Sequence, residues 1–367
     1  MKPYEPNTLP ISDLDFRRLL TLVGQANAEL ARYDGLLQGI VNPAVMLSPL
    51  TVEEAVLSSR LEGTQATIDE VYEHEAGIPV PEEKTHDLQE VANYRKALRQ
   101  AQEHLRLYPI TLSFVRAIHK ILLNSVRGQD KTPGNFRTDQ NWIGRKGCSI
   151  TEASFVPPSP LRLTDHLEAW SNYIGGEDVD VLLQAAVMHA QFELLHPFKD
   201  GNGRIGRLLI PLFLFQKKHL SQPMFYLSAY LEAHREEYYD ALGAISKTGD
   251  WNSWIAFFLQ AIVAQAQGNI HKVNEIRDLY DSMKSKIQNT THSQHTMQVL
   301  DAIFNRPIFR TSDFVDETKI LKPTAMTLLR QLKSAGILKE LSPGSGRRPA
   351  VLCFPALLNI AEGKKII

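Results

Sequence analysis

The chain has 367 residues, 43% of them hydrophobic and 22% charged, which is ordinary for a folded protein with at least one sizeable core. Its formal net charge of −1 removes global charge as an argument for nucleic-acid or membrane binding, although a local basic patch stays open. The two cysteines, Cys148 and Cys353, are too few for a disulfide framework or a cysteine-based metal site. The start lacks the apolar core of a signal peptide, and no uncharged run approaches the ~18 residues of a spanning helix. We therefore expect a cytoplasmic protein without membrane contact.

The first third of the chain is predicted to consist of helices. Apolar residues recur at helical spacing from Asp13 to Leu37, after a proline-rich arm. Thr51, followed by two glutamates, is predicted to cap a second helix, and Gly63 to stop it. Further helices are expected over Ile68–Tyr72, Thr85–Leu107 and Thr111–Leu123.

The segment from 128 to 160 changes character, because its glycines and prolines, Gly128 among them, break any long helix. Asn141–Ile143 and Ser149–Thr151 could pair as a short β-hairpin around a turn at 144–147 that includes Lys146. A plain surface loop is the alternative. Loops of this length inside compact domains are often functional, which favours a role near a binding site.

One stretch combines residue types that suit a nucleotide-phosphate site: His196-Pro197-Phe198-Lys199-Asp200-Gly201-Asn202-Gly203-Arg204-Ile205-Gly206-Arg207. Apolar segments at Leu182–Leu195 and Leu208–Phe215 flank it, so we predict a loop between two buried helices, the second beginning near Gly203 or Arg204. Glycines let main-chain N–H groups approach an anion, and a helix N-terminus adds partial positive charge.

The side chains of this stretch add specific chemistry. Arg204 and Arg207 are three residues apart and would project from one side of a helix to clamp phosphate oxygens. Asp200 offers an oxygen ligand to Mg²⁺, His196 can accept a proton near neutral pH, and Phe198 is expected to anchor the loop in the core. A plain helix–helix turn is the alternative, but base, metal ligand, anion loop and two arginines within twelve residues make it the weaker interpretation.

At every defining position the stretch matches the signature His-x-Phe-x-(Asp/Glu)-Gly-Asn-Gly-Arg-x-x-Arg and thereby resembles the Fic family. The resemblance implies a mainly α-helical core that transfers AMP from ATP to a hydroxyl of a target protein, with release of pyrophosphate. It implies a catalytic base, a metal ligand and an ATP-binding set: His196; Asp200 for Mg²⁺; and Gly201, Asn202, Gly203, Arg204, Ile205, Gly206, Arg207 and Tyr239, the last bordering the adenine. Removal of AMP, transfer of another phosphate-containing group, and a DNA-binding regulator that senses ATP remain alternatives.

A second motif precedes the signature. Ser58-Ser59-Arg60-Leu61-Glu62-Gly63 resembles the Fic inhibitory motif, (Ser/Thr)-x-x-x-Glu-(Gly/Asn), with Ser58, Glu62 and Gly63 at its fixed positions. Taken alone, Glu62 is an exposed carboxylate that the helix dipole disfavours unless a cation lies nearby. The resemblance implies that Glu62 pairs with Arg207 and blocks productive placement of the ATP γ-phosphate. It also implies that the segment before the signature is a flap that aligns the target backbone by strand addition.

The rest of the chain is predicted to close the core and to form a further domain. An apolar helix at Trp251–Ala264 is followed, after Gln267-Gly268, by a polar helix at Asn269–Gln288. Beyond it, helices at Met297–Phe304, from Arg310 and at Pro323–Ala335 precede strands at Ile337–Glu340 and Ala350–Phe354. This order resembles a winged helix-turn-helix, in which Arg330, Lys333, Arg347 and Arg348 could contact DNA phosphates. A wing that binds protein or forms a homodimer is the favoured alternative.

The predicted fold class is therefore mainly α: a Fic-type helical core with a short β-hairpin flap and a C-terminal winged helix-turn-helix domain. The predicted parts are an N-terminal helical region with the inhibitory motif over 1–105, a catalytic core over 106–268, a linker helix over 269–295 and the winged domain over 296–367.

Overall fold

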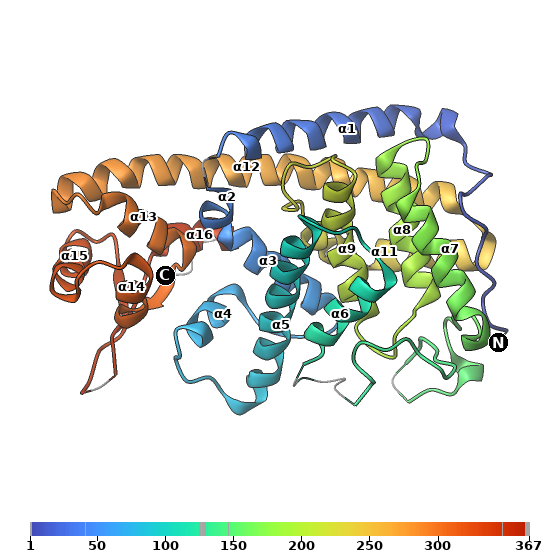
Figure 1. Cartoon of the computed structure of the whole chain (residues 1–367), viewed down its shortest axis with the longest axis horizontal. Helices are drawn as coiled ribbons and strands as arrows, with labels where there is room; N and C mark the ends of the chain where they lie inside the picture. Colours follow the sequence, from blue (N-terminus) through green and yellow to red (C-terminus); the bar gives the residue numbers. More distant parts are fainter. Residues whose placement is uncertain are drawn as a thin grey trace. The chain divides into compact units, whose positions relative to one another are not determined.

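The computed structural model describes residues 2–40, 42–124, 126, 130–145, 147–346 and 348–363, and these are mainly helical, as predicted (Figure 1). Predictions that involve Gly128, Lys146 or Arg347 lie outside the described residues. The helices are α1 (Phe16–Gln38), α2 (Pro43–Met46), α3 (Ser48–Leu61), α4 (Ile68–Glu75), α5 (Glu82–Leu105), α6 (Leu112–Leu122), α7 (Leu163–Gly175), α8 (Val181–Leu195), α9 (Asn202–Gln216), α10 (Ser228–Ala233), α11 (Arg235–Thr248), α12 (Trp251–Thr291), α13 (Thr296–Asn305), α14 (Thr311–Thr318), α15 (Lys322–Ser334) and α16 (Pro355–Glu362). The strands are β1 (Ile308–Arg310), β2 (Lys339–Ser342) and β3 (Val351–Cys353), and short 3-10 helices cover Ile150–Glu152 and Pro160–Arg162.

The chain divides into two compact units. The first consists of Met1–Leu37, Leu57–Gly63 and Ala92–Gln267, and it contains both motifs singled out in the sequence. The second consists of Gln38–Val56, Thr64–Val91 and Gly268–Ile367. Four helices of the described part, α1, α3, α5 and α12, contribute residues to both units, α1 only through Gln38. No helix of the described part combines the length and the apolar character that crossing a membrane requires.

The centre of the first unit is the pair α8 and α9, which pack against each other (Figure 1). Nearly every residue of both helices is buried, so neither has a solvent face of the kind that surface helices show. Asp180 starts α8 by accepting hydrogen bonds from the backbone N–H groups of Leu182 and Leu183 at 2.8 and 3.1 Å. Trp170 and Trp254 donate their indole N–H groups to carbonyls of α8, each at 2.9 Å, which fixes the surrounding helices to it. The loop between α8 and α9 is therefore held from both ends.

Two predicted helix boundaries are wrong. The helix with the inhibitory motif begins at Ser48 and not at Thr51, because Pro49 in its first turn needs no hydrogen-bonded N–H. The predicted break at Gln267-Gly268 is absent, since α12 continues for 41 residues to Thr291. A lone glycine costs only about 1 kcal/mol in a helix and does not end one. Gly63 does follow the end of α3, with φ +103°, as predicted.

The predicted hairpin around residues 144–147 is also wrong. Ile143 pairs with Phe155 in an isolated antiparallel bridge, and the predicted second strand is replaced by the 3-10 helix Ile150–Glu152. The cause is local, because the Glu152 carboxylate accepts hydrogen bonds from the backbone N–H and the hydroxyl of Ser149 at 3.0 and 2.8 Å. This capping contact closes a turn where a strand was expected.

In the second unit, α13, α14, α15 and α16 accompany a three-stranded antiparallel sheet with the order β1-β3-β2. Ile308 lies opposite Cys353 on one side of β3, and Lys339 lies opposite it on the other. Three residues, 319–321, separate α14 from α15. Arg310 at the end of β1 donates from Nε to the Ala76 carbonyl at 2.6 Å, so the sheet also holds the end of α4.

Candidate active site

The loop after α8 begins with a left-handed residue. His196 has φ 46° and ψ 59° and ends α8 as its C-cap. Its carbonyl accepts a hydrogen bond from Nε of Arg137 at 2.9 Å, and Nη2 of the same arginine reaches the Leu195 and Pro158 carbonyls at 3.3 and 2.6 Å. Arg137 is buried, and its cation lies where the helix dipole favours one. The backbone of His196 is thereby fixed from outside the loop.

The turn itself is closed by Asn202. Its side chain accepts from the Phe198 N–H at 2.8 Å and donates to the Phe198 carbonyl at 2.9 Å, which places the start of α9 at Asn202, slightly earlier than predicted. Phe198 is fully buried, as expected, and stacks on the ring of His119 at 3.7 Å between centroids. Gly201 has φ +78°, a conformation that favours glycine, so a side chain at this position would strain the turn.

His119 supports this loop from α6. The Gly134 N–H donates to His119 Nδ1 at 2.8 Å, so the ring proton sits on Nε2, which donates to the Asp200 carbonyl at 2.9 Å. Burial lowers the pKa of His119 to about 4, which keeps the ring neutral. The sequence offered no role for this histidine, and the structure gives it a positioning one.

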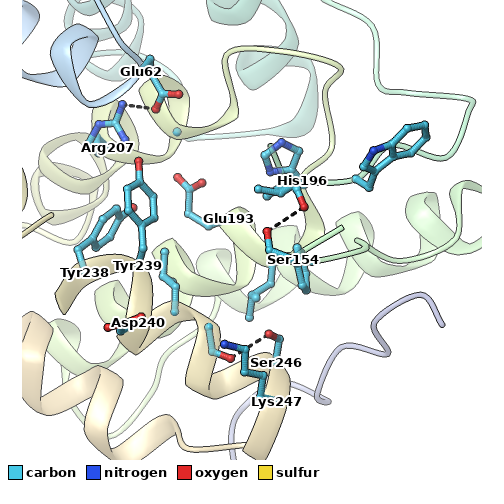
Figure 2. A pocket seen from close by; sticks show the side chains of 18 residues that line it. Glu62, Ser154, Glu193, His196, Arg207, Tyr238, Tyr239, Asp240, Ser246 and Lys247 are labelled. Carbon is cyan, nitrogen blue, oxygen red and sulfur yellow. Dashed lines mark hydrogen bonds and ion pairs between the residues drawn. The ribbon is translucent and has the colours of Figure 1, made fainter. Parts of the chain in front are cut away.

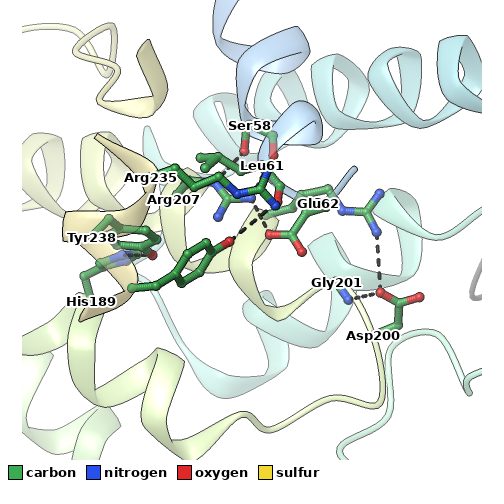
Figure 3. Close-up of polar contacts among 11 residues, drawn as sticks. Ser58, Leu61, Glu62, His189, Asp200, Gly201, Arg207, Arg235 and Tyr238 are labelled. Atoms are coloured by element: carbon green, nitrogen blue, oxygen red, sulfur yellow. Dashed lines mark hydrogen bonds and ion pairs between the residues drawn. The ribbon is translucent and has the colours of Figure 1, made fainter. Parts of the chain in front are cut away.

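The two arginines of the signature differ in their surroundings. Arg204 is 1% exposed, and its Nη2 lies 3.7 Å from Oδ1 of Asp200. The Asp200 side chain is 34% exposed, and it also accepts from the Gly201 N–H at 2.6 Å. Arg207 is equally buried but turns towards α3 (Figure 3). One arginine therefore orders the loop carboxylate, and the other is engaged by the upstream helix.

Three hydrogen bonds join Arg207 to Ser58 in α3 and to Glu62 directly after it. Its Nε donates to the Ser58 hydroxyl at 2.9 Å, and its Nη2 donates to the Ser58 carbonyl at 2.8 Å and to Glu62 Oε1 at 2.7 Å. Burial raises the pKa of Glu62, but the charge and hydrogen bond of Arg207 outweigh it and hold this pKa below its usual range. The Glu62 charge in turn raises the pKa of Arg207 against the effect of burial. The expected pairing of Glu62 with Arg207 is thus present.

Gly203 lets Glu62 approach the first turn of α9. A Cβ at this position would lie 2.2 Å from Glu62 Oε1 and 2.8 Å from Arg207 Nη1. The Glu62 carboxylate therefore lies against the first turn of α9, where the exposed N–H groups and the helix dipole favour an anion. A phosphate group would be stabilised at this end of α9 for the same reason.

The last turn of α3 is held by a further residue. Nη2 of Arg235, at the start of α11, donates to the Leu61 carbonyl at 2.9 Å (Figure 3). The Tyr239 hydroxyl lies 3.5 Å from the same carbonyl oxygen, and the Arg235 guanidinium lies 5.9 Å from the centre of the Tyr239 ring. Arg235 thereby satisfies a carbonyl that the end of a helix leaves without an internal partner.

A cavity of about 630 Å³ opens beside these groups (Figure 2). Four sets of residues line it: Glu62 directly after α3; Trp142, Ile143, Gly144, Ser154 and Phe155 around the Ile143–Phe155 bridge; Glu193, Leu194, His196, Gly203 and Arg207 from the signature helices and their loop; and Tyr238, Tyr239, Asp240, Leu242, Gly243, Ser246 and Lys247 from α11. The cavity joins a base, a cation, a helix N-terminus and an exposed aromatic face.

Some of the predicted site residues line this cavity, and the others do not. His196, Gly203, Arg207, Glu62 and Tyr239 line it. The others are absent from its lining: Gly63 follows α3, and the rest lie in the loop or in α3 and α9, namely Ser58, Asp200, Gly201, Asn202, Arg204, Ile205 and Gly206. Burial lowers the pKa of His196 to about 4, so its ring is a neutral base at physiological pH.

Two models of known protein families match this chain. The family described as "Fic/DOC family N-terminal" matches residues 20–103, and the one described as "Fic/DOC family" matches residues 109–214. The chain belongs to the Fic family. The second match contains the whole signature loop, and the first contains the inhibitory motif.

Among relatives of this Fic chain, a probable protein adenylyltransferase of Aquifex aeolicus (strain VF5) is 28% identical over 204 residues, which are 55% of the chain and 59% of that protein. Protein adenylyltransferase Fic of Aedes aegypti is 30% identical over 151 residues, which are 40% of the chain and 27% of that protein. The chain thus matches little more than half of the first relative and about a quarter of the second.

Solved structures show the same fold. A Fic family protein from Desulfovibrio desulfuricans G20 superposes with a TM-score of 0.59 at 18% identity, over 96% of this chain and 98% of that one. Fic-1 (aa134–508) from C. elegans superposes with a TM-score of 0.53 at 18% identity, over 70% of this chain and 73% of that one. At this identity, the likeness concerns the fold.

Three residues of the Fic site escaped prediction from the sequence: Arg137, Glu193 and Arg235. Glu193 carried a usable signal, because it is the one charged residue between Val181 and Leu195 and lies three positions before His196. Arg137 and Arg235 carried no such signal, since an arginine in a loop or at a helix start is usually solvated.

Proposed function

We propose that this Fic protein is a protein adenylyltransferase, that it transfers AMP from ATP to a tyrosine, threonine or serine hydroxyl of a target protein, and that Glu62 inhibits it. The names of the two relatives support the reaction class. The observation that carries the proposal is the engagement of Arg207 by Ser58 and Glu62 at the start of α9, where a polyphosphate would otherwise bind. ATP is then the nucleotide substrate, and the cytoplasm is the expected location.

In the proposed reaction, His196 accepts the proton of the target hydroxyl as a neutral base. The hydroxyl oxygen forms a bond to the α-phosphorus, and the bond from that phosphorus to the β-phosphate oxygen breaks, so pyrophosphate leaves. The main chain of Gly201, Asn202 and Gly203 and the N-terminus of α9 stabilise the phosphate charge. Arg204 and Arg207 neutralise the charge that grows on the leaving group.

The residues present fit a Mg²⁺ ion only together with a nucleotide. The described residues contain no group of three or more histidine, cysteine or acidic side chains that could hold a metal. The 34% exposed carboxylate of Asp200 is nevertheless suitable, because Mg²⁺ is commonly bound by one or two carboxylates plus substrate phosphates. When bound, the ion would neutralise phosphate charge. Asp200 would hold it beside Arg204, with its backbone fixed by His119.

Self-inhibition follows from the donors that Arg207 already uses. Nε and Nη2 already donate to Ser58 and Glu62, so a γ-phosphate would compete with Glu62 for this guanidinium. Removing one partner of a buried ion pair costs roughly 3–5 kcal/mol, and the 30% exposure of Glu62 places this pair at or below the lower end. Inhibition of this strength can be reversed by a protein or ligand that moves α3.

The segment around the Ile143–Phe155 bridge is proposed to align the target backbone. Trp142 and Ile143 are 42% and 40% exposed and line the cavity that His196 also lines. An extended peptide that pairs with this segment would bring a hydroxyl towards His196, since strand addition is a common mode of peptide recognition.

The experiment that tests the reaction uses two labels. Purified protein is incubated with ATP labelled either at the α-phosphate or at the γ-phosphate, and protein-bound label is counted for wild type and Glu62→Gly. AMP transfer predicts label only from the α-position, and more in the variant. Label from the γ-position would indicate phosphate transfer instead. Release of AMP from a pre-modified target, without addition, would favour the reverse activity.

A second candidate function concerns residues 296–363. The separation of α14 from α15 by only three residues, and the antiparallel pair β2 and β3 beyond them, support a winged helix-turn-helix. Arg330 and Lys333 are exposed on α15, although Lys333 pairs with Glu340, and Arg348 lies in the Ser345–Arg348 bridge. Salt-dependent binding of DNA fragments, weakened by Arg330→Ala, would support DNA as the partner. A concentration-dependent dimer in light scattering would support the alternative, a dimer-forming wing.

A further inference from the structure

Glu193 occupies an unusual position in the last turn of α8. Every other residue from Val181 to Leu195 is uncharged or a histidine, yet the Glu193 side chain lines the cavity together with His196. In Figure 2, its carboxyl group lies between the Arg207–Glu62 pair and the His196 ring. The mechanism described above gives this residue no role.

Gly206 provides the space that this carboxyl group occupies. A Cβ on Gly206 would lie 2.1 Å from Glu193 Oε1 and 3.3 Å from the His189 ring. Oε1 is buried, and it has no hydrogen-bond partner among the described residues. Glu193 thus combines a carboxyl oxygen that the protein leaves without a partner with a position in the cavity lining, where a ligand can contact the carboxyl group.

The groups that face Glu193 leave it without a counter-ion. Glu62 directly follows α3 and Arg207 comes from α9, but this arginine already donates to Glu62 and Ser58. His189 comes from α8 and His196 from the loop that follows it, and both rings are kept neutral by burial, which lowers their pKa values to about 3 and about 4. From α11 come Tyr238 and Tyr239, whose pKa values burial raises.

These surroundings decide the protonation state of Glu193. Burial raises the pKa of its carboxyl group to about 8; the Glu62 charge adds to this rise, and the Arg207 charge opposes it. At neutral pH the group is therefore a carboxylic acid, which can donate a hydrogen bond to an oxygen anion. Its ionised form would instead repel a phosphate.

We propose that Glu193 binds the nucleotide as a neutral carboxylic acid, donating a hydrogen bond to an oxygen of the bound ATP, and that loss of its proton ends tight nucleotide binding. The inference deepens the proposed function and rests on it, because ATP is the ligand. Glu193 is a nucleotide-binding residue in this account and takes no proton from the target hydroxyl.

A pH titration of ATP binding isolates this group. The pKa of Glu193 lies above those of the neighbouring histidines and below those of the neighbouring tyrosines, so Glu193 titrates separately from them. The Kd for ATP of the wild-type chain should rise about tenfold from pH ~7 to pH ~9. Glu193→Gln, which keeps the donor and cannot ionise, should show a nearly constant Kd, and it also reports any contribution from the titration of ATP itself.

Three further measurements support the titration, and the last of them checks folding. Calorimetry in two buffers of different ionisation enthalpy should detect uptake of nearly one proton when ATP binds to wild type above pH ~8, and none with Glu193→Gln. Glu62→Gln removes the neighbouring negative charge, so the rise in Kd should move to lower pH. Equal melting curves for wild type and Glu193→Gln confirm that both are folded.

The results of these measurements distinguish failure of the Glu193 role from failure of the proposed ATP-dependent function. A rise in Kd that is the same in wild type and Glu193→Gln, or absent from both, overturns the role of Glu193 while ATP binding stands. If no protein binds ATP at any pH, the proposed function fails, and the inference fails with it.

Discussion

Nη2 of Arg207 donates to Oε1 of Glu62 at 2.7 Å, and the same guanidinium holds the hydroxyl and the carbonyl of Ser58. Two nitrogens of this arginine in the nucleotide signature are therefore engaged by the protein's own chain before any ligand arrives. Arg204, three residues earlier, is also buried, and its Nη2 lies 3.7 Å from Oδ1 of Asp200. The two arginines consequently have different proposed tasks: Arg204 serves the reaction, and Arg207 is shared between ATP and α3.

Replacement of His196 tests the base. His196→Ala, made in a Glu62→Gly protein, should lower the rate of AMP transfer by about 10²–10⁴-fold, since this is the usual contribution of general-base catalysis. The Kd for ATP should change little, because no phosphate contact is assigned to His196. His166→Ala, on α7 and away from the cavity lining, is the matched control. Equal rates with and without His196 would show that another group accepts the proton.

Release of α3 can be tested without touching Glu62. Arg235→Ala removes the donor to the Leu61 carbonyl, which frees the last turn of the inhibitory helix and should raise AMP transfer by about 2- to 10-fold, as expected for a hydrogen bond worth ~0.5–1.5 kcal/mol. Arg235→Lys retains a donor and should stay close to wild type. Identical activity of the two variants would mean that this contact does not hold α3.

Acid should destabilise the protein through its buried histidines. The pKa values of His119, His189 and His196 are lowered to about 4, 3 and 4. Between the unfolded value of ~6.5 and these folded values, the unfolded chain binds more protons, so stability is lost as pH falls. Glu193 opposes this trend, because its raised pKa adds stability as pH falls below about 8.

The net effect is measurable by urea unfolding. Three histidines outweigh one glutamate, so the free energy of unfolding should fall by about 1–3 kcal/mol per pH unit below pH ~6.5. His119→Gln, whose amide can replace the donor to the Asp200 carbonyl, should make the dependence shallower. Stability that stays constant or increases down to pH ~5 would contradict the assignment of neutral buried histidines.

Much of the site could be predicted from the sequence because it is local. Loop glycines, arginines and the histidine lie within twelve residues, and flanking apolar segments place them between two helices, so Gly201, Asn202 and Arg204 fall in the loop and the first turn of α9, as expected. The pairing of Glu62 with Arg207 came only from the resemblance, since 145 residues separate the two and no periodicity connects them.

The incorrect or missing predictions have physical causes in local capping, in helix packing and in contacts between distant residues. The hairpin was predicted from two short segments around a turn at 144–147, but the Ser149–Glu152 capping contact gave a 3-10 turn. The break at Gly268 was predicted from composition, although packing carries α12 through it. Arg137 and Arg235 escaped because their partners are main-chain carbonyls of residues far away in the sequence. Glu193 escaped although its charge within an apolar helix was a usable signal.

The central claim, that Glu62 holds Arg207 away from ATP, is tested most directly by protein-bound label from α-labelled ATP in wild type and Glu62→Gly. The account predicts at least about a tenfold higher rate in Glu62→Gly, because displacing the ion pair costs more than ~1.4 kcal/mol, the equivalent of one factor of ten. Glu168→Gly, the same substitution at an exposed position of α7, should match wild type. Equal labelling of wild type and Glu62→Gly would contradict the claim.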